Sequence, residues 1–141
     1  MPKPAQTKPV RGKQPDSEKL TLNLGFVDLG QIDLLVAESF YANRSDFIRT
    51  AIRNQLAQHA EVVKQVAARK TLVLGLQHFS AEQLRALQAS GESLDLRVLG
   101  LASIAADVTP ALALATIRSL HVLGALQASP AVKAALAPRM R

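Results

Sequence analysis

Polar and apolar residues alternate strictly over residues 19–24, which read KLTLNL, and the pattern then changes to helical spacing. Strict alternation is the period of a β-strand with one buried face. Between Leu29 and Val36 the apolar residues instead recur every three or four positions, as on one face of an amphipathic helix. The pattern predicts a strand that leads into a helix, with Asp28 as the N-cap of that helix.

A second amphipathic helix is predicted after the SFYANR segment, with Ser45 as its N-cap. Its apolar residues form one stripe, made of Phe47, Ile48, Ala51, Ile52 and Leu56. Valines in residues 59–70 extend the same stripe, so the helix is expected to continue through them. The strand and the two helices define a predicted domain over residues 18–68.

This domain is too small to be stable alone, because about forty residues bury too little apolar surface without disulfides or a metal. No second strand follows within hairpin reach, which would leave the backbone of the first strand without a ladder. Both needs are met if two copies pair their strands antiparallel about a two-fold axis and interlock their helices. The predicted core of this intertwined dimer consists of Leu20, Leu22, Leu24, Phe47, Ile48 and Ile52.

Residues 71–141 contain an internal repeat. VLGL occurs at 73–76 and at 98–101, and VLGA follows at 122–125. A strand-plus-helix unit of this length is the size of one solenoid turn, and a short stack of such units has exposed edges. The pattern predicts a small strand-helix repeat domain for oligomerisation or partner binding. The alternative is an ordinary small α/β domain in which the three runs coincide by chance.

Each of these apolar runs is followed by a helix start signal. Ser80 and Gln83 have the spacing of a capping box. The Thr-Pro pair at 109–110 and the Ser-Pro pair at 129–130 place a capping residue directly before a proline at the first helical position. Together with the N-terminal pattern, these units predict the α+β fold class.

The net charge of +6 favours a polyanionic partner. The charge does not lie in the strand-helix-helix pattern, because residues 20–58 carry three Arg against four Asp or Glu. Residues 1–17 contain four Pro and four Lys or Arg, and we expect a disordered basic arm whose Arg11 and Lys13 contact phosphate. The alternative for this arm is a tail that only aids solubility.

Several function classes are not expected. The absence of cysteine removes thiol catalysis, disulfides and thiolate metal sites, and fits a reducing compartment. His59, His78 and His121 stand apart, and no Gly-rich phosphate loop occurs, so neither a metal site nor a cofactor is predicted. Without an apolar N-terminal segment or a membrane-length apolar stretch, we expect a cytoplasmic, nucleoid-associated protein that is not an enzyme.

The polar face of the predicted strand carries Lys19, Thr21 and Asn23, and the dimer presents this set twice. A two-stranded ribbon fits the major groove of B-DNA, where these side-chain types can bond base edges. The turn at residues 43–45 opens the second helix, whose N-terminal N–H groups and dipole suit a backbone phosphate. Double-stranded DNA is therefore the predicted partner.

Residues 19–56, KLTLNLGFVDLGQIDLLVAESFYANRSDFIRTAIRNQL, resemble a ribbon-helix-helix DNA-binding domain of the Arc/MetJ/CopG type. The strand, the NRSDFIRTAIR opening of the second helix and the overall span carry the resemblance. It implies base contacts by Lys19, Thr21 and Asn23. It also implies phosphate contacts by Asn43, Arg44 and Ser45.

The function favoured by these patterns is a sequence-specific transcriptional regulator that acts as a dimer, with the C-terminal repeat for higher assembly. An alternative is a polymerising scaffold or DNA-organising protein, in which the repeat assembles the dimers. A third hypothesis is an antitoxin. It ranks last, because antitoxin tails tend to be short and polar, whereas residues 71–141 are apolar and repetitive.

Overall fold

The computed structural model describes residues 17–141. The chain divides between His59 and Ala60 into two compact units, and each is described by itself. This division places residues 60–68, which the apolar pattern assigns to the first domain, in the second unit. The predicted phosphate contacts Arg11 and Lys13, with almost all of the predicted basic arm, lie outside the described residues.

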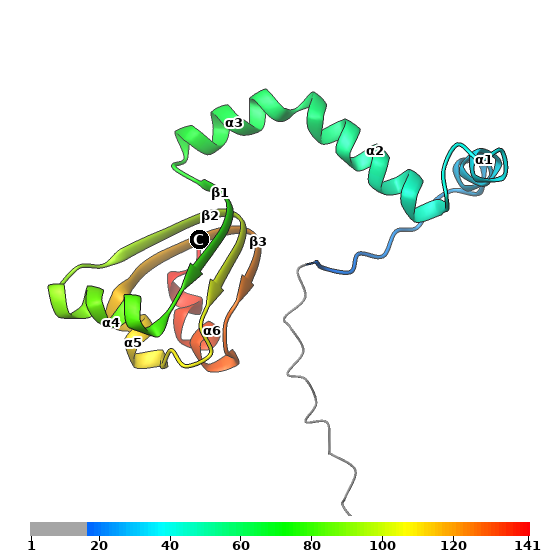
Figure 1. Cartoon of the computed structure of the whole chain (residues 1–141). Helices are drawn as coiled ribbons and strands as arrows, with labels where there is room; N and C mark the ends of the chain where they lie inside the picture. Colours follow the sequence, from blue (N-terminus) through cyan, green and yellow to red (C-terminus); the bar gives the residue numbers. More distant parts are fainter. Residues whose placement is uncertain (1–16) are drawn as a thin grey trace, which may run out of the picture. The chain divides into compact units, whose positions relative to one another are not determined.

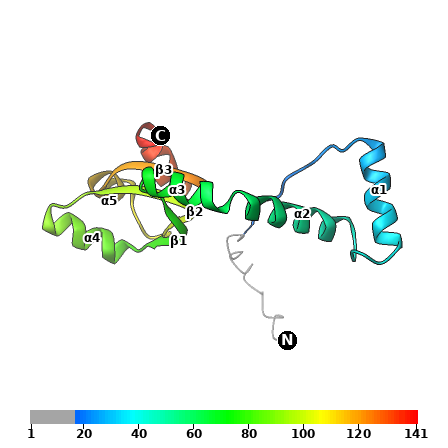
Figure 2. The same ribbon diagram turned by 90° about the horizontal axis from the view of Figure 1, so that it is seen from above.

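The first unit contains two helices, α1 (Phe26–Ala37) and α2 (Arg44–Gln58). α1 runs across the direction of α2 in both views (Figure 1 and Figure 2). Residues 18–25 form neither helix nor strand within the chain. The antiparallel ribbon predicted for residues 19–24 is thus not formed within one chain, because a strand requires a neighbouring strand for its hydrogen bonds.

α1 begins earlier than predicted. Gly25 occupies the N-cap position, and no side chain caps the helix there. The prediction that Asp28 is the N-cap is wrong, since Asp28 lies in the first turn, where its negative charge favours the positive end of the helix dipole. Acidic residues are favoured both at the N-cap and in the first turn, so residue type alone could not place the start.

α2 also begins earlier than predicted, with Asn43 rather than Ser45 as its N-cap. The Oδ1 atom of Asn43 accepts a hydrogen bond from the N–H of Asp46 at 2.8 Å. Asn and Ser are both good caps, so residue type alone could not choose between Asn43 and Ser45. The predicted helical continuation through residues 59–70 is confirmed in part, because residues 60–69 are helical but form a separate helix after His59. The N–H of His59 donates to the carbonyl of Leu56 at 3.1 Å, which closes α2.

The second unit alternates helices and strands. In chain order it consists of α3 (Ala60–Arg69), β1 (Val73–Phe79), α4 (Ala81–Ser90), β2 (Leu94–Ile104), α5 (Pro110–Thr116), β3 (Ile117–Gln127), α6 (Pro130–Leu136) and the 3₁₀ turn η1 (Ala137–Arg139). The three strands lie side by side in the order β1-β2-β3, and both pairings are parallel. The strands curve over α4, α5 and α6, which lie on one side of the sheet (Figure 1). The content of helices and strands agrees with the α+β class, but the pairing within the chain is parallel and not that of the predicted antiparallel ribbon.

The helix starts predicted in this unit are confirmed. Ser80 and Gln83 form the full capping box, with Ser80 Oγ accepting from the N–H of Gln83 at 3.1 Å and Gln83 Oε1 accepting from the N–H of Ser80 at 3.0 Å. The side chains of Thr109 and Ser129 cap α5 and α6, each before a proline at the first helical position. These local signals determine where each helix that covers the sheet begins.

The three VLG runs lie in register across the sheet. Gly75 pairs with Gly100, and Gly100 pairs with Gly124. All three glycines have positive φ angles, between 118° and 139°. A Cβ atom on Gly100 would overlap the carbonyl oxygen of Gly75, and one on Gly124 would overlap that of Gly100. Glycine is therefore required at Gly100 and Gly124 both by the backbone angle and by the close approach of the preceding strand.

The core of the second unit lies between the sheet and its helices. Alternate residues of β2 point into it, and Leu96 and Ile104 pack there with residues of the covering helices. The fully buried large side chains include Leu84, Ile117, Leu120, Val132 and Leu136. The one buried polar side chain among the described residues, Thr116, donates its hydroxyl to the carbonyl of Leu112 at 2.8 Å.

Candidate nucleic-acid interface

The segment predicted to read DNA is exposed on both faces within one chain. Lys19, Thr21 and Asn23 are exposed, as a contact surface requires. The intervening leucines are exposed too, with 77% of Leu20, 59% of Leu22 and 41% of Leu24 accessible. These three leucines therefore expose apolar surface to water, which is unfavourable, and in the predicted strand they would form one stripe opposite the polar residues.

The helices of the first unit also leave apolar surface uncovered. Ile32 is the one buried hydrophobic residue among residues 17–59. Phe47 and Ile48 of the predicted dimer core are half-buried, and Phe47 packs its ring edge-on to Tyr41 with 5.0 Å between ring centres. Large apolar side chains that remain exposed in this unit include Phe26, Val27, Leu34, Phe40, Ile52 and Leu56. The unit has the apolar residues of a core but does not bury them within one chain.

The start of α2 is built by a local hydrogen-bond network. Asn43 caps the N–H of Asp46, and the Oδ2 atom of Asp46 accepts from the N–H of Ala42 at 2.9 Å. The N–H groups of the first two helical residues, Arg44 and Ser45, have no acceptor within the helix, as at every helix N-terminus. They point along the axis from the positive end of the helix dipole, which is a favourable geometry for a phosphate oxygen.

Arg44 is held by a partner that the sequence did not indicate. Its guanidinium donates two hydrogen bonds to Asp33 of α1, from Nε to Oδ1 at 2.7 Å and from an Nη atom to Oδ2 at 2.8 Å. These hydrogen bonds lower the pKa of the Asp33 carboxyl below its usual value and raise the pKa of Arg44. Asp33 joins α1 to the start of α2 in this way, and it competes with any phosphate for the Arg44 fork.

Two further cations lie on α2. Arg49 and Arg53 are exposed, and neither forms an ion pair with any residue in the described part of the chain. The carboxylate of Asp46, which the spacing would allow as their partner, is engaged with the backbone of Ala42 instead. Both guanidinium groups therefore remain in solvent on the first unit.

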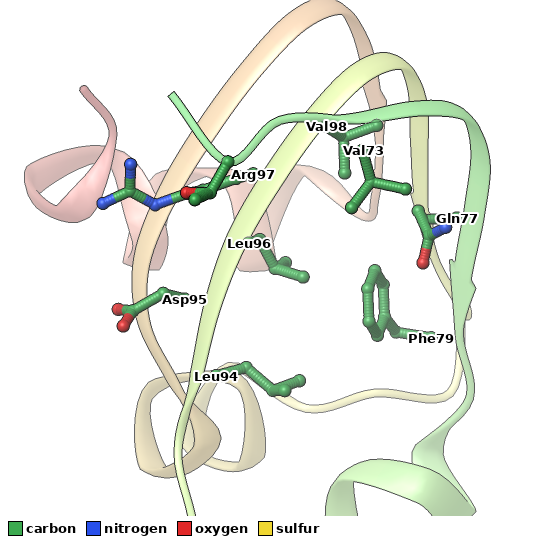
Figure 3. A pocket seen from close by; sticks show the side chains of 9 residues that line it. Val73, Gln77, Phe79, Leu94, Asp95, Leu96, Arg97 and Val98 are labelled. Carbon is green, nitrogen blue, oxygen red and sulfur yellow. The ribbon is translucent and has the colours of Figure 1, made fainter. Parts of the chain in front are cut away.

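The second unit has a cavity of about 460 Å³ beneath β1 and the first half of β2. Leu94, Leu96, Val98 and Phe79 point toward it, whereas Asp95 and Arg97 point away (Figure 3). Asp95 accepts hydrogen bonds from Arg118 and from Ser119, the latter at 2.7 Å, and both strongly lower the pKa of its carboxyl. Asp95 is thus engaged in an ion pair with Arg118, and Arg97 donates to the carbonyl of Lys70, so the side chains that point into the cavity are largely apolar.

The histidines do not assemble a metal centre. Within residues 17–141, no group of three or more His, Cys, Asp or Glu side chains lies close enough to hold a metal ion. His78 has a ring nitrogen 3.2 Å from Ser103 Oγ on the neighbouring strand, and His59 has one 3.1 Å from the side chain of Gln55.

No described helix is both long and apolar enough to cross a membrane.

Comparison with known protein families gives a match over most of the chain. No curated protein and no solved structure is significantly similar to it. Residues 15–133 match the model of the ribbon-helix-helix transcriptional regulator family. This confirms the resemblance seen over residues 19–56, and the match extends through the sheet of the second unit to α6. The chain therefore belongs to the ribbon-helix-helix transcriptional regulator family.

Proposed function

We propose that this protein is a sequence-specific, DNA-binding transcriptional regulator that acts as a homodimer through a β-ribbon in the major groove. The observation that carries the proposal is the alternation over residues 19–24, where Leu20, Leu22 and Leu24 alternate with polar residues and all six are exposed. Membership of a transcriptional regulator family supports DNA as the partner.

Dimer formation follows from what one chain leaves exposed. The stripe of Leu20, Leu22 and Leu24 and the apolar residues of α1 and α2 need a cover, and a second copy supplies the same residues. In the proposed dimer the two segments pair antiparallel and complete each other's backbone hydrogen bonds. The predicted core residues Phe47, Ile48 and Ile52 then lie beneath the ribbon with the leucines.

Base recognition is assigned to the polar face of the ribbon. Lys19 can donate to guanine O6 and N7, Asn23 can form a bidentate pair with adenine, and Thr21 offers a hydroxyl and a methyl group. A two-fold dimer presents each side chain twice, so it favours a two-fold symmetric site.

Phosphate contacts are assigned to the start of α2 and to the basic arm. At α2 the backbone N–H groups of Arg44 and Ser45 and the side chain of Asn43 supply the donors, because the Arg44 guanidinium is paired with Asp33. Arg11 and Lys13 of the arm would add charge that residues 20–58 lack.

The second unit is assigned to higher assembly of these dimers. It has its own core and an apolar outer sheet face, and within the described residues its sheet edges are unpaired along β1 and along residues 122–126 of β3, which are features of an association surface. These features also favour the second candidate function, a DNA-organising scaffold in which assembly is the main role and sequence reading is minor.

Selection of bound duplexes from a random-sequence pool by the full-length protein separates the two functions. A regulator is expected to enrich an inverted-repeat motif, and the variant Lys19→Ala/Thr21→Ala/Asn23→Ala should lose that enrichment while it still folds. Binding without any enriched motif would contradict sequence-specific regulation and favour the scaffold. Absence of binding at low salt would contradict both functions.

A further inference from the structure

The parallel sheet of the second unit has two edges, and both are at least partly unpaired in the described part of the chain. β1 forms one edge and β3 the other. The outer edge of β1 pairs with no described residue. On β3, Met140 forms a bridge with Leu120, and the N–H of Arg141 donates to the carbonyl of Leu120 at 2.9 Å. Beyond that point, the outer edge of residues 122–126 pairs with nothing in the described part of the chain.

The glycine row shows what fits against β1. Gly100 and Gly124 each leave room for the carbonyl oxygen of the glycine on the preceding strand. Gly75 has the same kind of backbone, with a φ angle of 122°, yet a Cβ atom there would meet nothing within 4 Å. Gly75 therefore has the backbone conformation that receives a neighbouring glycine carbonyl, and no strand among residues 17–141 supplies one.

Side-chain exposure across the sheet also indicates that β1 lacks a neighbouring strand on its outer side. Leu74 is 74% exposed and Leu76 67% exposed on β1, whereas their register partners on the middle strand, Leu99 and Leu101, are half-buried. On the opposite face, Val73 is 48% exposed and its partner Val98 only 1%. One more parallel strand beside β1 would give its side chains the environment that β2 already has.

We propose that β3 of one copy of this chain pairs in parallel with β1 of the next copy and so continues the sheet from molecule to molecule. The register follows from the repeat and places Leu123 beside Leu74 and the Gly124 carbonyl against Gly75. It also pairs residues 122–126, the uncovered part of β3, with residues 73–77. The inference rests on the assembly role proposed above and uses no property of the ribbon.

The helices are compatible with this continuation. Within the chain α4 contacts α5, and α5 contacts α6, all on one side of the sheet (Figure 1). Parallel continuation keeps the helices of both copies on that side and places α6 of one copy beside α4 of the next. Since the two contact surfaces differ, the interface is head-to-tail and leaves a free edge at each end, which permits open-ended assembly.

Engineered cysteines test the register, because the chain contains none of its own. Adjacent parallel strands lie about 4.8 Å apart, within the span that a disulfide bridges. Under mild oxidation, a mixture of full-length Leu74→Cys and Leu123→Cys chains should form mixed disulfide dimers. The double variant should form a ladder of linked chains that disappears on reduction. A Leu76→Cys and Leu123→Cys mixture is the matched control, two residues out of register, and should link far less.

The outcomes of this cross-linking are distinct. Efficient disulfide formation by Leu74→Cys alone would indicate a two-fold β1–β1 contact and overturn the proposal. Equal yields from the in-register and out-of-register mixtures, or no cross-linking in either, would overturn it as well. Binding of each variant to a short duplex is measured in parallel. Loss of DNA binding with the ladder retained contradicts the proposed ribbon function alone, and the reverse contradicts the edge contact alone.

Gly75→Ala tests the contact without cross-linking. In one chain the added methyl group meets nothing, but in the stacked arrangement it would overlap the Gly124 carbonyl of the next copy. Gly91→Ala is the matched control, since Gly91 also has a positive φ angle and open space but lies at the end of α4. Sedimentation should show Gly75→Ala reduced to dimers, while Gly91→Ala retains the larger species. Leu74→Lys provides a second variant without backbone strain, and wild-type assembly by both β1 variants would overturn the proposal.

Discussion

The two units of this chain differ in how much of their apolar surface they bury within one chain. The second unit closes a core between its sheet and helices, with Leu84, Ile117 and Leu136 fully buried. The first unit buries one hydrophobic residue, Ile32, and leaves the leucines of residues 20–24 and much of α2 in solvent. The second unit thus closes its core within one chain, and the exposed apolar surface of the first unit supports the proposal that a second copy covers it.

The two units also leave different kinds of surface uncovered. In the first unit the uncovered residues are those of a core, so the proposed partner completes the fold about a two-fold axis. In the second unit the core is complete, and what remains open is the edge of a sheet with an apolar outer face. Such an edge permits association without being needed for folding.

The largest expected effect is that of Leu22→Asp, which should unfold the first unit and leave the second folded. The substitution places a charge in the proposed shared core, at a cost above about 4 kcal/mol, and no monomeric fold is available to retain. Hydrogen exchange should lose protection over residues 26–58 and keep it over residues 73–136.

Thr21→Asp is the control, since it introduces the same charge on the neighbouring residue of the polar face. It should preserve the protection of α1 and α2 and weaken DNA binding. A folded first unit in Leu22→Asp, detected as protection equal to that of Thr21→Asp, would contradict the dimer core.

The next effect concerns the core of the second unit. Leu84→Ala removes a fully buried side chain and should destabilise this unit by roughly 2–5 kcal/mol. In the Gly75→Ala background, which removes the proposed edge contact, this unfolding should depend only weakly on protein concentration, unlike that of the first unit, because the core lies within one chain. In the same background, where the proposed edge contact is absent, Leu74→Ala, at an exposed position of the sheet, should change the free energy of unfolding by less than about 0.5 kcal/mol. Denaturant titrations at two protein concentrations measure both, and a strong concentration dependence of Leu84→Ala would contradict an independent core.

The sequence predicted local features of these units well where the signal is short-range. The starts of α4, α5 and α6 were read from Ser80, Thr109 and Ser129, because a capping residue and the residues just after it act within one turn. Where two capping residues compete, the prediction failed. Asn43 lies two positions before Ser45, and both are good caps, so propensity could not choose between them.

Features that depend on pairing across the chain were not predicted. The parallel order β1-β2-β3 is consistent with strands joined by helices, but the VLG repeat alone does not fix direction. The contact of Arg44 with Asp33 joins residues eleven positions apart across a turn, and no periodic pattern marks it. Lys19, Thr21 and Asn23 are exposed in the described part of the chain, and their contact with bases stays a prediction, while the partner that holds Arg44 was missed.

A smaller effect is expected at the polar face of the first unit. Asn23→Ala should weaken binding to a preferred site by roughly 1–3 kcal/mol and leave binding to random DNA nearly unchanged, because a base contact is lost and no phosphate contact. Asn54→Ala, at an exposed position of α2, serves as the control and should have no effect. Competition titrations with specific and random duplexes provide the comparison. Equal weakening on both duplexes would mean that Asn23 does not read a base.

The smallest expected effect concerns the Arg44–Asp33 pair, which limits the charge that the first unit can offer to DNA. Hydrogen bonds from Arg44 lower the pKa of Asp33, so this carboxylate stays ionised well below neutral pH and its stabilising contact is lost only as pH falls through that lowered value. No pH suited to DNA binding releases Arg44, and substitution is needed. Asp33→Asn should strengthen binding to all sequences alike.

The dependence of log K on log salt should also steepen in Asp33→Asn, by about 0.9 for each additional phosphate that the protein neutralises. Asp28→Asn removes the same charge from the first turn of α1 without touching Arg44, and should leave the slope unchanged. Parallel lines for the two variants would show that Arg44 does not reach a phosphate once it is released. A steeper dependence of log K on log salt for Asp33→Asn alone would show that the Arg44–Asp33 pair weakens non-specific binding, because it holds a cation of the interface away from the DNA backbone.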